Sequence, residues 1–147
     1  MTVANTDRRK LRVLFLCTGN SCRSQMAEGW ARKLKGDEIE AFSAGTVAKG
    51  LDPRAVRAMA EAGADISGHK SKTLAELMAA GLDFDLVVTV CGAAHESCPI
   101  FPGRTRVIHH GFDDPPKLAE GASDEEEAMG HYRRVRDEIR AFVEGLA

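Results

Sequence analysis

The sequence predicts an α/β fold: a single doubly wound domain with a four-stranded parallel sheet, in the order 2-1-3-4, flanked by helices. Short apolar runs alternate along the chain with segments whose apolar residues recur at helical spacing, and this alternation is typical of β-α-β units. The chain has 147 residues, of which 44% are hydrophobic. That length suits one compact core but hardly two. We expect one domain over residues 11–147 after a flexible leader over residues 1–10.

Each predicted strand is a short run dominated by apolar residues. The run at 12–16 (RVLFL) suits a buried parallel strand because its apolar residues are consecutive. The other strands are expected at 38–44, 86–90 and 106–109. Ligand sites in such sheets lie at the carboxyl ends of the strands, beside the point where the strand order reverses. That point flanks the first strand, which leads into Cys17.

The predicted helices are marked by their start and stop residues. Ser24 can cap a helix that runs to about Lys35. Pro53 fits the first turn of the next helix, which Gly63 ends. Further helices are expected at 73–80 and from a capping-box pattern at 123–126 to the end of the chain, with 113–122 as a loop-rich stretch.

Charge and composition exclude several classes of function. The formal net charge of −2 gives no general attraction to nucleic acid or to a membrane surface, so any anion site must be local. No apolar stretch approaches the length that spans a bilayer, and residues 1–10 lack the apolar core of a secretory signal. We expect a cytoplasmic monomer. In that reducing compartment its four cysteines are catalytic, metal-binding or inert rather than structural disulfides.

The segment CTGNSCRS at 17–24 has the features of an anion-binding loop. The pattern Cys-x5-Arg, formed by Cys17 and Arg23, is weak by itself. Its context strengthens it, because the segment follows a strand, contains small or polar residues and leads into a helix. Backbone N–H groups there would cradle a tetrahedral anion, and the planar fork of Arg23 would clamp two of its oxygens. The candidate oxyanion-binding residues are Thr18, Gly19, Asn20, Ser21, Cys22, Arg23 and Ser24.

Cys17 is the candidate nucleophile of this loop. The donors that bind the anion are expected to lower the pKa of Cys17, and Ser24 is placed to donate a hydrogen bond to its sulfur. Gly19 allows the backbone to approach closely, and Asn20 tolerates a left-handed conformation. Cys22 is expected to be a small buried thiol, not a redox residue.

From about residue 12 onward the chain resembles the thioredoxin-coupled arsenate reductases, which share a fold with low-molecular-weight protein tyrosine phosphatases. The resemblance begins with CTGNSCRSQMAEGW at 17–30. It continues in the same order through SAG at 43–45, DIS at 65–67, VVTVCG at 87–92, CP at 98–99 and GFDDP at 111–115. The resemblance implies a low-molecular-weight phosphatase-like fold and the reduction of arsenate to arsenite for arsenic detoxification.

The resemblance also implies a relay of three thiols. Cys17 attacks arsenate while a carboxylic acid protonates the departing oxygen. Cys91 then attacks the Cys17–arsenic adduct, which expels arsenite and leaves a Cys17–Cys91 disulfide. Cys98 attacks Cys91, and reduced thioredoxin opens the resulting disulfide as electron donor. No bound cofactor is expected, and phosphate or sulfate would compete with arsenate.

The acid that the resemblance implies is Asp114, because the matching aspartate precedes a proline. Pro115 biases Asp114 toward an extended conformation, and a carboxyl group there can act as general acid. Asp113 is the alternative.

The positions of the cysteines in the predicted sheet support the relay independently of the resemblance. Cys17 and Cys91 follow neighbouring strands of the predicted sheet, so their sulfurs are expected on one rim. Cα atoms of disulfide partners lie about 4.4–6.8 Å apart, whereas a helix over seven residues spans about 10 Å. The segment 91–98 must therefore loop or unwind for Cys98 to reach Cys91, and we expect it to be mobile.

Some relatives bind a potassium ion behind the loop. Asn20, Glu28 and Ser43 match side chains of that site, while Lys72 stands where a further acidic ligand is expected. The lysine ammonium can take the place of the cation, so strong potassium binding is not expected. No other metal is predicted.

The nearest competing function is that of a low-molecular-weight protein tyrosine phosphatase. Such an enzyme needs the loop and its acid but neither Cys91 nor Cys98. It also needs apolar walls around an aryl ring, whereas the loop at 45–52 carries no aromatic residue. Pro116 stands where many phosphatases have tyrosine. A small inorganic oxyanion therefore fits better.

The third hypothesis is a zinc-binding structural module. Cys91, His95 and Cys98 could supply ligands, with Cys17 or Cys22 as the fourth. This spacing is not that of a familiar zinc finger, and a core of this size does not need a metal.

Overall fold

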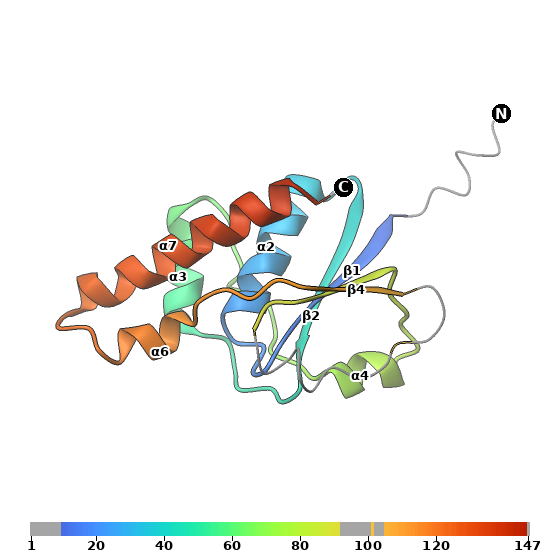
Figure 1. The fold of residues 1–147 in the computed structure, drawn as a ribbon, viewed down its shortest axis with the longest axis horizontal. Coiled ribbons are helices and arrows are strands. Elements are labelled where there is room, and N and C mark those ends of the chain that lie inside the picture. The colour runs from blue at the N-terminus through green and yellow to red at the C-terminus, as the bar shows by residue number, and fades with distance from the viewer. Residues whose placement is uncertain (1–9, 92–100, 102–104, 147) are drawn as a thin grey trace.

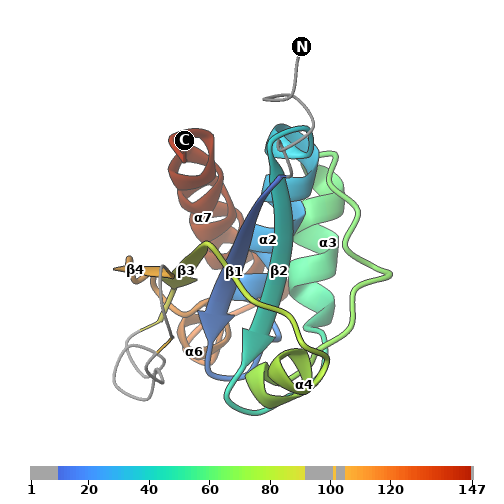
Figure 2. The same ribbon diagram turned by 90° about the vertical axis from the view of Figure 1, so that its right-hand side faces the viewer.

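The computed structural model describes residues 10–91, 101 and 105–146. Figure 1 shows the sheet beside the helices, and Figure 2 shows its four strands in the order β2-β1-β3-β4. All the strands are parallel, so the predicted fold class and strand order are confirmed. The strands are β1 (Leu11–Cys17), β2 (Ile39–Gly45), β3 (Leu86–Thr89) and β4 (Arg106–His109). Each lies within one residue of its predicted bounds. The leader expected at 1–10 lies outside the described residues except for Lys10, which is exposed.

Helices cover both faces of the sheet. They are α2 (Arg23–Lys35), α3 (Pro53–Glu61), α4 (Leu74–Ala79), α6 (Pro115–Ala119) and α7 (Glu125–Glu144). Figure 2 shows α2, α3 and α7 together behind the sheet, with α4 in front of it near the end of β2. None of the helices in the described part of the chain combines the length and apolar character that crossing a membrane requires.

The core lies between the sheet and the layer of α2 and α7. The middle of β1, residues 13–16, is completely buried, as expected for a strand covered on both faces. Trp30 of α2 is completely buried as well, and its indole N–H donates to the carbonyl of Arg136 on α7 at 3.1 Å. Burying each large side chain contributes about 1.5–3 kcal/mol to the stability of the fold. This packing holds α2, and the loop that precedes it, against the end of β1.

The expected cap at Ser24 is wrong. Helix α2 begins at Arg23, and its N-cap residue Cys22 makes no side-chain hydrogen bond to the helix. The hydroxyl of Ser24 is used elsewhere, because it accepts from the amide of Asn20 and shares a hydrogen bond with the sulfur of Cys17. The N–H groups at the start of the helix are thus left for a ligand.

Two predictions near the C-terminus also need correction. The stretch expected to be a loop contains α6, which starts at Pro115 after Asp114, because proline is preorganised for the first turn of a helix. The cap of α7 is Asp124, not Ser123: its carboxylate accepts from the N–H of Glu127 at 2.8 Å. Ser123 instead donates to the Glu127 side chain at 2.8 Å.

Candidate active site

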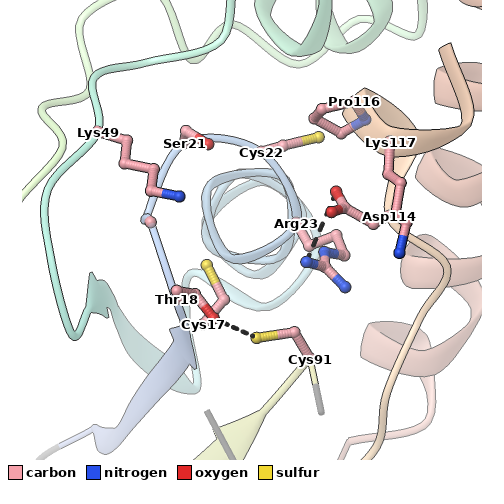
Figure 3. A pocket seen from close by; sticks show the side chains of 11 residues that line it. Cys17, Thr18, Ser21, Cys22, Arg23, Lys49, Cys91, Asp114, Pro116 and Lys117 are labelled. Atoms are coloured by element: carbon pink, nitrogen blue, oxygen red, sulfur yellow. Dashed lines mark hydrogen bonds and ion pairs between the residues drawn. The ribbon is translucent and has the colours of Figure 1, made fainter. Parts of the chain in front are cut away.

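A pocket of about 440 Å³ opens at the carboxyl ends of β1 and β3, where doubly wound sheets bind ligands. More than half of its lining residues belong to the segment 17–24 (Figure 3). The lining residues are Cys17, Thr18, Gly19, Ser21, Cys22, Arg23, Lys49, Cys91, Asp114, Pro116 and Lys117. The pocket thus unites the predicted oxyanion loop with the predicted second thiol and the predicted acid.

Asn20 fixes the shape of the loop from behind and is completely buried. Its backbone is left-handed, with φ of 49°, a conformation that asparagine tolerates better than most residues. Its side-chain oxygen accepts from the N–H of Lys72 at 2.9 Å and from the amide of Gln25 at 3.0 Å. The side-chain nitrogen must therefore face Ser24, to which it donates at 2.9 Å. The predicted role of Asn20 in holding the loop is confirmed.

Gly45, at the end of β2, lets that strand pass directly beneath the loop. A Cβ at this position would lie 2.6 Å from the carbonyl oxygen of Thr18 and 2.8 Å from the nitrogen of Asn20. The N–H of Gly45 also donates to the carbonyl of Lys72 at 2.9 Å. Any side chain here would displace the loop, so the glycine of the SAG motif has a steric role.

Cys17 is the last residue of β1, and only 3% of its surface is exposed. Its sulfur lies 2.8 Å from the hydroxyl of Ser24 and 3.3 Å from the N–H of Asn20. Ser24 accepts from Asn20, so its hydroxyl proton can be donated to the sulfur when Cys17 is a thiolate. A hydrogen bond between Ser24 and Cys17, as predicted, is confirmed.

The expected direction of the Cys17 pKa is wrong. A hydrogen bond with the Cys91 side chain and burial raise the pKa of Cys17 well above that of an ordinary thiol. The hydroxyl and N–H of Ser24 and the N–H of Asn20 act in the predicted direction and lower it, but they do not prevail. The sequence identifies the donors of the loop and the neighbouring sulfur of Cys91, but not the effect of that sulfur on the pKa of Cys17.

Cys91 lies directly after β3, beside Cys17 (Figure 3). The two strands are paired in register, with Leu16 opposite Thr89, and the N–H of Val90 donates to the carbonyl of Leu16 at 2.9 Å. The sulfur of Cys91 also lies 3.4 Å from the hydroxyl of Thr18. The expectation that both sulfurs lie on one rim is confirmed.

Arg23 is the first residue of α2, and its guanidinium faces the pocket. It donates to the carbonyl of Phe112 at 2.9 Å and lies 3.6 Å from a carboxylate oxygen of Asp114. Asp113 instead points to α7, where it forms an ion pair of 2.9 Å with Arg134. Of the two predicted acids, only Asp114 lines the pocket.

Comparison with known proteins identifies the family of the chain. Residues 12–147 match the family described as low molecular weight phosphotyrosine protein phosphatase. An arsenate reductase of Halalkalibacterium halodurans is 54% identical, over 92% of this chain and 94% of its own length. The chain belongs to the arsenate reductase family.

Solved structures of this family share the fold. An arsenate reductase in a phosphate-binding state has a TM-score of 0.70 at 31% identity, covering 91% of this chain and 94% of that one. A thioredoxin-dependent arsenate reductase of Corynebacterium glutamicum has a TM-score of 0.63 at 25% identity, covering 95% of this chain and 63% of that one. The arsenate reductase family and the phosphatase-like fold, both expected from the motifs, are thus confirmed.

In this member of the arsenate reductase family, Cys22 is a buried thiol beside the pocket. Only 3% of its surface is exposed. Burial, followed by the negative charge of Asp52, raises its pKa well above that of an ordinary thiol, although Arg23 opposes the shift. Cys17 differs from Cys22 because Ser24 and the N–H of Asn20 act to lower its pKa. The burial of Cys22 agrees with its expected packing role.

Behind the loop, this arsenate reductase family member has a buried carboxylate, Glu28, with only 3% of its surface exposed. Ser43 donates to it at 2.5 Å, Arg32 pairs with it at 2.7 Å, and the ammonium of Lys72 lies 3.8 Å away. Burial lowers the pKa of Lys72, and the charge of Glu28 opposes that shift. Lys72 therefore puts a positive charge beside Glu28 of the predicted cation site; His69 also approaches the carboxylate, at 3.9 Å.

Several predicted residues of this family member lie outside the described part of the chain. They include Cys98, His95 and most of the segment 91–98 expected to be mobile. Within residues 10–91, 101 and 105–146, no three histidine, cysteine or acidic side chains gather as a metal-binding group. Two ligands of the zinc alternative, His95 and Cys98, lie outside these residues.

Two lysines of the pocket were missed from the sequence of this arsenate reductase family member. Lys49 comes from the loop after β2, and Lys117 comes from α6. Neither stands in a motif, so only their positions in space reveal them. In the sequence, the loop at 45–52 stands out only for its lack of aromatic residues. The residue of this loop that lines the pocket is its one cation, Lys49.

Proposed function

We propose that this protein reduces arsenate to arsenite through a relay of Cys17, Cys91 and Cys98 that reduced thioredoxin resets. The observation that carries the proposal is that Cys91, directly after β3, lines the same oxyanion pocket as Cys17 at the end of β1. Hydrolysis of a phosphate ester needs one nucleophilic sulfur. A second thiol in the same pocket suits a reaction that ends in a disulfide.

The first step builds a sulfur–arsenic bond. Arsenate binds to the N–H groups of the loop and to the guanidinium of Arg23. The thiolate of Cys17 attacks the arsenic, and one oxygen leaves as water after Asp114 donates a proton. Ser24 favours the attacking thiolate because its hydroxyl is hydrogen-bonded to the sulfur at 2.8 Å.

The second step transfers the electrons. The thiolate of Cys91 attacks the sulfur of Cys17, so that an S–S bond forms and the S–As bond breaks. The electron pair of the broken bond stays on arsenic, which leaves as arsenite while two thiols are oxidised to a disulfide. The hydroxyl of Thr18, 3.4 Å from the sulfur of Cys91, can favour the thiolate that attacks.

The third step returns Cys17 to the thiol. Cys98 attacks the sulfur of Cys91 and forms the disulfide that a dithiol protein then reduces. Thioredoxin is the proposed donor, supported by the thioredoxin-dependent arsenate reductase to which this chain is similar. We propose that the enzyme acts as a monomer in the cytoplasm, whose reducing environment keeps its thiols available.

A phosphatase is the alternative that the fold itself favours. The loop, the guanidinium of Arg23 and the carboxylate of Asp114 would serve a phosphate ester equally well. The described pocket has no aromatic wall, since the only ring in its lining is that of Pro116. Weak hydrolysis of aryl phosphates is therefore expected as a side activity, because phosphate and arsenate share their shape.

The test follows NADPH consumption with arsenate, thioredoxin and thioredoxin reductase. Wild type should consume NADPH, and Cys17→Ser, Cys91→Ser and Cys98→Ser should not. In a single turnover without thioredoxin, Cys98→Ser should still release one arsenite per protein and be left with a Cys17–Cys91 disulfide, visible by mass spectrometry. Cys91→Ser should release none.

Each competing function has its own outcome. Normal turnover by Cys91→Ser and Cys98→Ser would show that no relay operates. Hydrolysis of p-nitrophenyl phosphate by wild type, with no NADPH consumed in the coupled assay, would establish the phosphatase. Stoichiometric zinc in the purified protein would support the structural module.

A further inference from the structure

We propose that Lys49 is a second cationic ligand of the oxyanion, contacting it from the side of the pocket opposite Arg23. Figure 3 shows the two residues on either side of Cys17, with the amino group of Lys49 directed toward the pocket. The proposal rests on the proposed function for the identity of the anion, but it applies to any tetrahedral dianion that the loop binds.

The Lys49 side chain packs against Gly19. The N–H of Lys49 donates to the carbonyl of Gly19 at 2.9 Å. A Cβ built on Gly19 would lie 2.9 Å from the Cδ of Lys49 and 3.3 Å from its Cβ. The aliphatic stem of Lys49 thus fills the space that a side chain at position 19 would occupy. The sequence explained this glycine by the approach of the backbone to the anion; its contact with Lys49 adds a second reason.

This packing lowers the entropic cost of holding the ammonium group of Lys49 in the pocket. A free surface lysine loses about 2 kcal/mol of side-chain entropy when it is fixed in one geometry. The stem of Lys49 is confined along the loop before any anion arrives, because its backbone and its first three side-chain carbons lie against Gly19. The Lys49 side chain therefore loses less entropy when an anion binds, and its charge contributes more to the binding affinity.

The charges that line the pocket leave a role for this residue. Arg23 is already partly neutralised by Asp114, 3.6 Å away. Lys117 of α6 lies on the same side of the pocket as Arg23 and Asp114 (Figure 3). Of the three cations in the pocket lining, only Lys49 lies on the side away from Asp114 (Figure 3). A dianion held between Arg23 and Lys49 has both of its negative charges matched.

The test measures the binding of inorganic phosphate by calorimetry at low ionic strength. Lys49→Ala should weaken binding about ten-fold, which corresponds to about 1.4 kcal/mol, and Lys49→Arg should recover affinity to within about three-fold. Lys33→Ala is the matched control. It removes the same charge from the exposed end of α2, about 15 Å along the helix from Arg23, and should leave affinity unchanged.

Two results would overturn the assignment. One is phosphate affinity in Lys49→Ala equal to that of wild type. The other is an equal loss of phosphate affinity in Lys117→Ala. That result would indicate a long-range electrostatic effect of the positive charges around the pocket and no specific contact of Lys49 with the anion. With arsenate as substrate, Lys49→Ala should raise KM about ten-fold and leave kcat within about two-fold.

The two proposals fail separately. Phosphate binding requires no electron transfer, so a Lys49 effect on phosphate affinity in a protein that never reduces arsenate would contradict the proposed function alone. Arsenate reduction with an unchanged KM in Lys49→Ala would contradict the role of Lys49 alone.

Discussion

At the scale of single residues, two opposing sets of neighbours control the proton of Cys17. Cys91 and burial favour the thiol, whereas Ser24 and the N–H of Asn20 favour the thiolate. The first set prevails, so the pKa of Cys17 is raised and the thiol is favoured. The second thiol of the proposed relay therefore also restrains the first.

This opposition predicts alkylation rates of opposite sign in two variants. Cys91→Ala removes the largest cause that raises the pKa of Cys17. The pKa falls, more thiolate is present at pH 7.5, and iodoacetamide should modify Cys17 more than about five-fold faster. Ser24→Ala removes a donor that lowers the pKa, so its Cys17 should react more slowly than that of wild type. Mass spectrometry of the labelled peptide assigns the rate to Cys17. Slower labelling in Cys91→Ala would refute this account of the pKa.

The sequence predicted the members of the site better than their interactions. Cys17, Arg23 and Asp114 stand in motifs, and the structure brings all three to one pocket. The pKa of Cys17 could not be predicted, because it depends on the separation of two sulfurs that belong to different strands. Lys49 was missed for the same reason, since its value lies in its contact with Gly19 and not in any local pattern.

At the scale of elements, Asp52 joins α3, α7 and the oxyanion loop. Its carboxylate caps α3 by accepting from the N–H of Arg54 at 2.9 Å, and it accepts from the hydroxyl of Tyr132 on α7 at 2.6 Å. Its own N–H donates to the carbonyl of Ser21 in the loop at 2.9 Å. Burial and the Asp52 carboxylate raise the pKa of Tyr132, so this phenol remains a donor at any working pH.

Tyr132→Phe should therefore destabilise the protein by about 1.5–2 kcal/mol, because it removes a hydrogen bond to a charged, half-buried acceptor. Urea unfolding measures the loss. The control is a double-mutant cycle with Asp52→Asn, whose coupling energy should be at least about 1 kcal/mol. Additive losses would mean that the two side chains do not interact energetically.

The elements themselves were predictable where their patterns are long. The four strands and the helices α2, α3, α4 and α7 appear where apolar spacing and terminal residues place them. Helix α6 was missed because five residues that begin with two prolines are too short to show a helical period. The cap of α7 was displaced by one residue because Ser123 and Asp124 are both good caps, and only their contacts decide between them.

At the scale of the whole molecule, the buried cluster around Glu28 holds the back of the active site together. Glu28 lies on α2, Ser43 on β2, and Lys72 just before α4. The N–H of Lys72 also donates to Asn20, so the cluster is continuous with the oxyanion loop. Helix, sheet and loop are therefore connected through one carboxylate and its cations.

This connection predicts how the protein responds to alkali cations. In wild type the ammonium of Lys72 lies 3.8 Å from Glu28, so Tm should be the same in equal concentrations of NaCl and KCl. Lys72→Ala leaves the carboxylate with one cation fewer, which should lower Tm and make it rise again with KCl more than with NaCl. Thermal scans of both proteins in the two salts test this. A wild-type Tm that rises specifically with potassium would show that the lysine does not replace the cation.

The strand order was predictable because each β-α-β unit leaves few alternatives. The pairing register was not, because it depends on how the side chains of β1 and β3 pack, with Leu16 opposite Thr89. That register sets the height of Cys91 relative to Cys17, and a shift by one residue would turn one sulfur to the other face.

The burial of the two sulfurs has a consequence for how electrons enter the protein. Cys17 and Cys91 expose only 3% and 4% of their surfaces. A thiolate must reach a disulfide sulfur directly to open it, so a bond between these two residues, within the oxyanion pocket, would be hard for a folded reductant to reach. We infer that this burial is the reason for a third thiol in the proposed relay: by attacking Cys91, Cys98 would take over the disulfide that the protein reductant opens.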